Sequence, residues 1–189
     1  MKFGILGEAK IAREHVVPAI LAAGHHVTHV GRRNPGQKPL PNIYKNAIET
    51  DYEALINEPS IDAIYNPLPN HLHVPYSIKA LQAGKHVLCE KPVALNIEEL
   101  INLESAAKES GAFFYEAYMV RSHPQWHWLQ NLDIGKYQSS HFIFSYPDQP
   151  KGNIRNRKVD GGGPLYDIGC YAILSGCMLF TGTPKVLSA

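Results

Sequence analysis

The chain has 189 residues, of which 44% are hydrophobic and 19% charged, and its formal net charge is +1. This balance is typical of an ordinary soluble globular protein and gives no sign of a nucleic-acid-binding surface. No stretch approaches the ~20 apolar residues of a membrane span, and the first residues are too glycine-rich for a signal peptide, so no membrane segment is expected.

Cysteine and histidine spacing excludes two further classes of protein. The three cysteines, Cys89, Cys170 and Cys177, form no paired framework, which fits reduced thiols in a cytoplasmic protein. His71 and His73 are two residues apart, but no third ligand follows at a spacing that metal sites use. We therefore expect neither a disulfide scaffold nor a metal site.

The first element is a buried strand over residues 3–6, and it leads into the turn 7–12. This turn has the shape of a dinucleotide-binding loop, with alanine in place of the second and third glycines. A helix should follow and end at Gly24. Backbone N–H groups at a helix start favour a pyrophosphate, and a small residue lets it approach. We expect Glu8 to point outward, and the alternative is an ordinary strand–helix turn. The predicted cofactor contacts here are Gly7, Ala9, Lys10 and Ile11.

The second strand, residues 26–30, ends at Gly31-Arg32-Arg33. An NAD site usually carries an acidic residue about 20 residues after the glycine turn, whereas arginine suits the 2′-phosphate of NADP. This chain has two guanidinium groups at that point and no carboxylate. We predict that Arg32 and Arg33 bind the cofactor and that NADP is preferred over NAD, and the alternative is a solvated basic turn.

The next elements continue the alternation of strands and helices. Residues 51–57 predict a short helix capped by Asp51, residues 61–65 a strand, and residues 73–83 a helix. The loop 66–71 between the last two contains two prolines and should be rigid. We expect the loop and the helix start to contact the cofactor through Pro67, Leu68, Asn70 and His73.

Residues 86–90 predict a strand that ends at Glu90-Lys91-Pro92. In an open parallel sheet the ligand lies beyond the carboxyl ends of the strands, so Lys91 is placed where chemistry occurs. Pro92 restricts the backbone that aims it. The alternative is an exposed charged turn. A helix capped by Asn96 follows, with a predicted buried stripe, and then a strand at 113–118. The stripe is Ile97, Leu100, Ile101, Leu103 and Ala107.

The repeated strand–helix pattern predicts an α/β fold, a doubly wound parallel sheet of the Rossmann type. The pattern changes after residue 121, so we expect domains at 1–121 and 122–189. The second part predicts a helix at 124–132, a strand at 137–146 and a helix entered near Pro164. In that helix Asp167 and Tyr171 are four residues apart and share a face. They form a candidate acid/base set with Lys91, or else a capping acid and a core tyrosine.

Together these segments resemble the glucose-fructose oxidoreductase, inositol dehydrogenase and rhizopine catabolism (Gfo/Idh/MocA) family. The resemblance implies a Rossmann domain that holds NAD(P) and a hydride transfer to or from a sugar, polyol or trans-diol hydroxyl. It implies that Lys91 and Asp167 are catalytic and that Glu90 and Arg121 contact the cofactor. Tyr171 stands where many members carry histidine, as in the branch with a proposed tyrosine acid/base. The matching segments are 4–12, 62–71, 84–92, 116–121 and 161–171.

Members of that family are considerably longer, and their second domain is a large, mostly antiparallel sheet. We therefore expect a shortened, incomplete α+β second domain and the loss of most of the family's dimer surface. Besides an oxidoreductase, the sequence leaves open a catalytically inactive dinucleotide-binding remnant or partner subunit. A third possibility is a sugar-modifying enzyme that uses bound NAD transiently.

Overall fold

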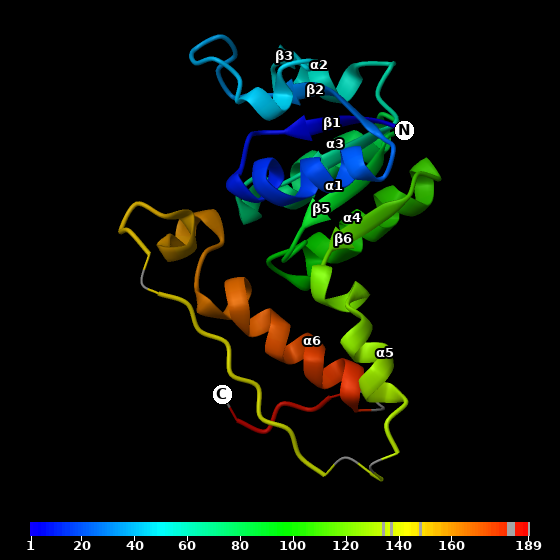
Figure 1. Ribbon diagram of the computed structural model, residues 1–189, viewed down its shortest axis with the longest axis vertical. Coiled ribbons are helices and arrows are strands. Elements are labelled where there is room, and N and C mark those ends of the chain that lie inside the picture. The colour runs from blue at the N-terminus through cyan, green and yellow to red at the C-terminus, as the bar shows by residue number, and fades with distance from the viewer. Residues whose placement is uncertain (134, 137, 148, 181–183, 189) are drawn as a thin grey trace. The chain divides into compact units, whose positions relative to one another are not determined.

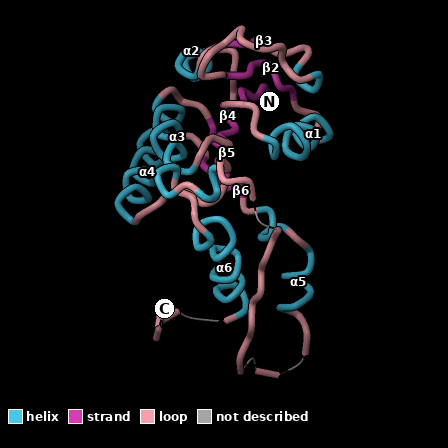
Figure 2. Tube along the Cα trace, turned by 90° about the vertical axis from the view of Figure 1, so that its left-hand side faces the viewer, coloured by secondary structure: helices cyan, strands magenta, loops and turns pink. Residues whose placement is uncertain are grey.

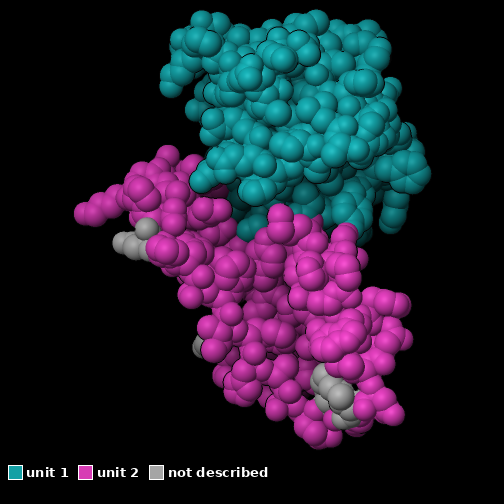
Figure 3. All heavy atoms as spheres, in the orientation of Figure 1, with its two compact units in different colours: residues 1–117 teal, residues 118–189 magenta. Residues whose placement is uncertain are grey.

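A computed structural model describes residues 1–133, 135–136, 138–147, 149–180 and 184–188. The chain forms two compact units, Met1–Ala117 and Tyr118–Ala189 (Figure 3). The division falls shortly before the boundary expected at residue 121. Each unit is described by itself below.

The first unit is built on a six-stranded, wholly parallel sheet in the order β3-β2-β1-β4-β5-β6 (Figure 1). This is the doubly wound parallel sheet that the alternation of strands and helices predicts, and the strand order reverses direction between β1 and β4. The strands are β1 Lys2–Leu6, β2 His26–Gly31, β3 Ile48–Thr50, β4 Ala63–Asn66, β5 His86–Glu90 and β6 Phe114–Ala117.

Helices cover both faces of this sheet (Figure 2). The helix after β1 starts as a π-helical turn, η1, and continues as α1. Two caps predicted from the sequence are confirmed: Asp51 Oδ1 accepts from Ala54 N at 2.8 Å, and Asn96 Oδ1 accepts from Glu99 N at 2.9 Å. The helices are η1 Ala12–Val16, α1 Val17–Ala22, η2 Asn42–Tyr44, α2 Tyr52–Asn57, η3 Asn70–Leu72, α3 His73–Gln82 and α4 Ile97–Ser110.

The strands separate two hydrophobic cores because successive side chains of a strand point to opposite faces. Ile5 packs in the cluster that contains α1, while its neighbour Leu6 packs in the cluster that contains α2, α3 and α4. In β4, Tyr65 and Ile64 divide in the same way. Each of these four side chains is fully buried. The sheet is therefore enclosed on both faces, and ligands have access to its edges and strand ends.

A glycine in β1 lets α2 approach the sheet. A Cβ on Gly4 would lie 2.8 Å from Leu55 Cδ2 and 2.9 Å from Ile61 Cδ1. Both distances are shorter than an ordinary contact, so a larger residue at this position would force the ends of the Leu55 and Ile61 side chains to shift.

Two details of the first unit differ from the sequence prediction. β3 is a three-residue edge strand that the polar sequence after residue 34 did not reveal. The predicted buried stripe of α4 is partly wrong, since Ile97 is 70% and Ile101 55% exposed, whereas Leu103 and Ala106 are buried. Apolar residues at helical spacing define several overlapping stripes, and packing against α3 selects one of them.

The described part of the second unit is helical. The strand predicted over 137–146 is wrong for residues 138–146, which form no strand; residue 137 lies outside the described residues. A strand needs a hydrogen-bonded partner, and no other described segment of this unit is a strand. Its elements are η4 Met119–Ser122, α5 Pro124–Gln130, η5 Ile154–Asn156, η6 Lys158–Asp160, the π-helical turn η7 Leu165–Gly169 and α6 Cys170–Leu179. Within the described ranges, no helix has the length and apolarity needed to cross a bilayer.

Lys85, a buried lysine directly before β5, forms hydrogen bonds with the turn before β4. Lys85 is 7% exposed, and its Nζ donates to the carbonyl oxygens of Glu58 at 2.7 Å and Ile61 at 2.8 Å. We expect Lys85→Met to lower the free energy of unfolding by about 1.5–3 kcal/mol, because two hydrogen bonds from a charged donor are lost. Urea denaturation measures this loss. The matched control is Lys79→Met, which breaks an exposed ion pair with Glu53 and should cost less than about 1 kcal/mol. Equal losses in both variants would contradict the anchoring role of Lys85.

Candidate active site

The predicted cofactor residues of the first unit gather at the carboxyl ends of four neighbouring strands. The order β2-β1-β4-β5 is continuous in the sheet, so the segments that follow these strands lie along one edge. They carry the predicted contacts in four groups: Arg32 and Arg33 after β2; Gly7, Ala9, Lys10 and Ile11 after β1; Pro67, Leu68 and Asn70 after β4; Glu90 and Lys91 at the end of β5.

The turn after β1 has the backbone that a dinucleotide loop needs. Gly7 has φ of +80°, where a side chain is strained, and its N–H donates to Gly31 O at 2.7 Å. A Cβ at Gly7 would also lie 3.3 Å from Leu68 Cδ2. Helical hydrogen bonding starts at once, with Arg13 N donating to Ala9 O at 3.1 Å. The residues present therefore fit a phosphate group at this turn, where the backbone is bare and a helix begins.

The two arginines after β2 differ in their surroundings. Arg33 is exposed, whereas Arg32 is 7% exposed and pairs with Glu8 at 2.7 Å and Glu49 at 2.9 Å. The pair with Glu8 joins the end of β2 to the turn after β1. Glu8 therefore does not simply point outward, as the sequence suggested, but contacts the arginine that we assigned to the cofactor.

The loop after β4 is held by a buried asparagine. Asn66 is fully buried; its Nδ2 donates to His73 O at 3.0 Å, and its Oδ1 accepts from Leu68 N at 3.3 Å. Pro67 and Leu68 are buried and Asn70 is partly exposed. These contacts fix the backbone of the loop beside the turn after β1.

The side chain of His73 is buried and does not face solvent. It is 1% exposed, and its Nδ1 and Nε2 lie 2.8 Å from Pro92 O and 2.7 Å from Leu68 O. The sequence assigned His73 to direct cofactor contact, but both ring nitrogens face backbone carbonyl oxygens in the interior. The ring instead joins the loop after β4 to the turn that contains Lys91.

Three contacts from neighbouring elements fix the turn that carries Lys91. Tyr65 from β4 donates through its hydroxyl to Glu90 Oε1 at 2.7 Å. His73 contacts Pro92 O, and Glu116 at the end of β6 accepts from Val93 N at 2.9 Å. Burial raises the pKa of Glu90, and burial and the neighbouring Glu90 raise the pKa of Tyr65, so the phenol stays protonated as the donor. The residues on both sides of Lys91 are thus held from three elements.

The pKa of His73 gives this turn a predicted pH dependence. Burial lowers that pKa more than the two carbonyl contacts raise it, so the folded chain holds the ring neutral. Its stabilising contribution is complete above the unfolded pKa of ~6.5 and decreases as the pH falls below that value. As the pH is lowered below ~6.5, we expect this histidine to reduce the free energy of unfolding by up to about 1.4 kcal/mol per pH unit.

Urea denaturation of the wild type and His73→Gln at about pH 7.5 and about pH 5.5 isolates this contribution. The variant should lose less stability between the two pH values than the wild type, because the other histidines are common to both. A greater loss in the variant would show that the two carbonyls favour the charged imidazolium.

The remaining predicted site residues lie in the second unit. Asp167 is 9% exposed, and its Oδ2 lies 2.9 Å from Arg155 Nε. The ring of Tyr171 packs edge-to-face against Tyr118 and Phe144, with centroid separations of 5.1 and 5.2 Å. Arg121 is exposed in η4. Asp167 is therefore held by a cation, and the ring of Tyr171 is held by aromatic packing.

Sequence reasoning missed three residues that support the candidate site: Tyr65, Glu116 and Arg155. Tyr65 looks like a core residue in the sequence of β4, and no local signal separates it from one. Glu116 is an acidic residue within an apolar strand, and its register opposite Cys89 places it near the end of β5. Arg155 lies in a polar loop without a recognisable motif. Among the described residues, no group of three metal-binding side chains was found.

The sequence of this chain is similar to those of known oxidoreductases. Residues 1–118 match the family model described as "Oxidoreductase family, NAD-binding Rossmann fold" of Gfo/Idh/MocA. D-xylose 1-dehydrogenase (NADP(+)) 2 of Haloferax volcanii is 36% identical over 196 residues, which cover 97% of this chain and 58% of the relative. A dTDP-3,4-didehydro-2,6-dideoxy-alpha-D-glucose 3-reductase of Actinomadura kijaniata is 36% identical over 179 residues, covering 92% of this chain and 54% of that protein.

A solved structure shows the same fold. The crystal structure of KijD10, a 3-ketoreductase from Actinomadura kijaniata in complex with NADP and TDP-benzene, aligns with a TM-score of 0.81 and 31% identity. The alignment covers 95% of this chain and 57% of that one. The chain thus spans little more than half the length of the relatives that it matches. The family model, the parallel sheet order and the strand-end segments lead to one conclusion: this chain belongs to the Gfo/Idh/MocA family of oxidoreductases.

Proposed function

We propose that the chain binds NADP(H) in preference to NAD(H) and takes part in hydride transfer to or from a sugar, polyol or trans-diol hydroxyl. The observation that carries the proposal is the alignment of four cofactor-type segments on the carboxyl ends of β2, β1, β4 and β5. Ligands of doubly wound sheets bind at this edge, where the strand order reverses. The relatives named for NADP, or solved with it, support the same choice of cofactor.

Different residues at this edge bind different parts of the dinucleotide. Gly7, Ala9 and the start of the following helix receive the pyrophosphate, because the turn carries no side chain at Gly7 and a helix begins there. The arginines after β2 serve the 2′-phosphate. Lys91 and Glu90, at the end of β5, contact the nicotinamide half of the cofactor. When bound, the nicotinamide supplies or accepts the hydride.

Proton movement at the substrate oxygen is the task of the chain's own side chains. A hydroxyl that loses a hydride from its carbon must also lose its proton, so a group that accepts and returns that proton is required. We assign the proton transfer to Tyr171 and the orientation of the substrate oxygen to Lys91 and Asp167. The turn around Lys91, whose neighbours are fixed, and the Arg155–Asp167 ion pair, at 2.9 Å, support these roles. The first fixes the backbone that carries Lys91, and the second fixes the carboxylate of Asp167.

Two measurements test the proposal in sequence. Fluorescence titration with NADPH and NADH should give saturable binding of both. A screen of aldoses, polyols and trans-diols should then give a change in nicotinamide absorbance with at least one of them. The absence of saturable binding would refute the proposal. Binding without turnover of any substrate would favour a dinucleotide-binding module instead of an enzyme.

A further inference from the structure

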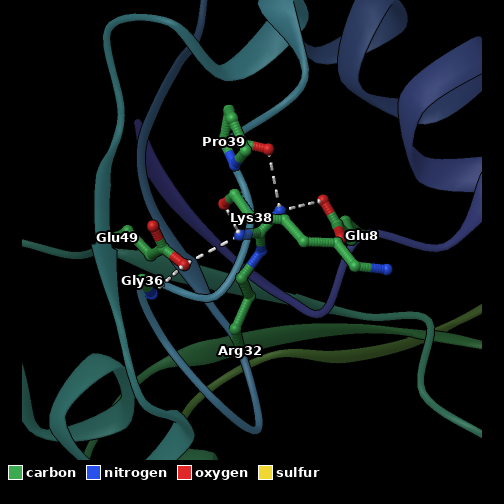
Figure 4. Close-up of polar contacts among 6 residues, drawn as sticks. All are labelled: Glu8, Arg32, Gly36, Lys38, Pro39 and Glu49. Atoms are coloured by element: carbon green, nitrogen blue, oxygen red, sulfur yellow. Dashed lines mark hydrogen bonds and ion pairs between the residues drawn. The ribbon is translucent and has the colours of Figure 1, made fainter.

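The guanidinium of Arg32 is surrounded by acceptors (Figure 4). Its Nη1 donates to Lys38 O at 2.5 Å and Glu49 Oε1 at 2.9 Å, and its Nη2 donates to Glu8 Oε2 at 2.7 Å and Pro39 O at 3.3 Å. Each of these nitrogens has two N–H groups, so all four are in use. A phosphate cannot bind to either nitrogen unless one of these partners leaves.

The partners differ in how firmly they are held. Lys38 and Pro39 contribute backbone carbonyls of the loop after β2, and Glu49 also accepts from Gly36 N at 2.9 Å. That contact, with Arg32, lowers the pKa of Glu49 and keeps it ionised at neutral pH. Glu8 lies on the opposite side of the guanidinium (Figure 4), and its side chain is 34% exposed, compared with 21% for Glu49. Glu8 is thus the partner that can move away most easily.

The carboxylate of Glu8 also has the chemistry of the group that we expect at Arg32. Carboxylates and phosphates both offer anionic oxygens that match the N–H pairs of a guanidinium. One guanidinium and two carboxylates leave the cluster with one net negative charge, which repels a phosphate. NAD(H) carries a hydroxyl in place of the 2′-phosphate, so it gains little from displacing Glu8.

We infer that Glu8 competes with the 2′-phosphate of NADP(H) for Arg32 and thereby sets how strongly the chain discriminates between NADP(H) and NAD(H). This inference rests on the proposed binding of dinucleotides at this edge, but it does not depend on hydride transfer. In the absence of NADP(H), the carboxylate of Glu8 takes the place at Arg32 that the 2′-phosphate would occupy. Breaking the Glu8–Arg32 pair costs free energy, which lowers the affinity for NADP(H) and hardly affects the affinity for NAD(H).

The test is a comparison of Glu8→Gln with the wild type by fluorescence titration with NADPH and NADH. We expect the Kd for NADPH to fall by at least about fivefold, because a competing and repelling charge is removed. The Kd for NADH should change by less than about twofold, since no phosphate enters the cluster. The matched control is Glu49→Gln, which removes the same charge from the other side of the guanidinium. It should give no selective gain for NADPH, because Glu49 holds Arg32 in place.

A double-mutant comparison distinguishes competition for Arg32 from a general charge effect. The gain from Glu8→Gln should disappear in an Arg32→Lys background, which keeps the charge but loses the planar fork. It should persist in an Arg33→Ala background, since Arg33 is exposed and the guanidinium that pairs with Glu8 is that of Arg32. Circular dichroism checks that each variant is folded. If Arg32→Lys does not fold, the Glu49→Gln control still decides, because a general charge effect would give the same gain there.

The outcomes separate this inference from the proposed function. Saturable binding by the wild type supports the proposed dinucleotide site, whatever the variants do, and its absence refutes that site. If the wild type binds and Glu8→Gln leaves the ratio of the two Kd values unchanged, the competition is refuted. An equal selective gain in Glu49→Gln, or equal weakening of both dinucleotides in Glu8→Gln, would also refute it.

Discussion

Lys91→Ala is expected to lower kcat at least about 100-fold while the Kd for NADPH changes by less than about threefold. The reason is the position of Lys91 at the end of β5, in a turn fixed by Tyr65, His73 and Glu116. A side chain on a backbone fixed in this way is suited to orienting a reacting oxygen, whereas the dinucleotide is expected to contact several other segments. Steady-state kinetics with the best substrate of the screen, together with fluorescence titration, measure the two effects separately.

The control for this prediction is Lys79→Ala on α3, which removes an exposed lysine and its pair with Glu53. This variant should keep the kcat of the wild type within about twofold. A Lys91→Ala variant that retains kcat would refute a catalytic role. An increase of the Kd for NADPH that fully accounts for lost activity would show that Lys91 only binds the cofactor.

The second large effect is expected for Tyr171→Phe, with a fall in kcat of about 100-fold and little change in stability. The ring of Tyr171 packs edge-to-face on Tyr118 and Phe144, and phenylalanine preserves both contacts. Only the hydroxyl that we assign to proton transfer is lost. The pH dependence of kcat should also lose the ionisation attributed to this group, which a purely structural role would not affect.

Tyr166→Phe is the matched control, because it removes a phenol five residues earlier in the same unit. It should leave kcat within about threefold of the wild type. If Tyr171→Phe has wild-type kcat and an unchanged pH profile, Tyr171 is not the acid/base, and its role is confined to packing. Thermal denaturation of both variants establishes whether the fold is preserved.

Much of the first unit could be predicted from the sequence because its signals are local. Asp51 and Asn96 cap helices through their own side chains, and Gly7 and Gly24 mark turns with positive φ. Strand ends followed by Arg32 and by Lys91 could be recognised for the same reason. Because parallel strands all end at the same edge of the sheet, the carboxyl edge was predictable, although the order of the strands and the short strand β3 were not.

What could not be predicted depends on distant partners. The three anchors of the Lys91 turn come from β4, α3 and β6, and no short motif connects them. The same holds for Arg32, whose two carboxylate partners are 24 and 17 residues away in sequence. The apolar alternation over 138–146 indicated a strand, but alternation alone cannot supply the partner strand on which pairing depends.

A crystal structure of the chain grown with NADPH would test the central assignment most directly. We expect the pyrophosphate on the backbone of the turn 7–11, the 2′-phosphate on Arg32 with Glu8 displaced, and the nicotinamide beside Lys91. NADPH bound away from the carboxyl ends of β1, β2, β4 and β5, or a nicotinamide remote from Lys91, would contradict the assignment.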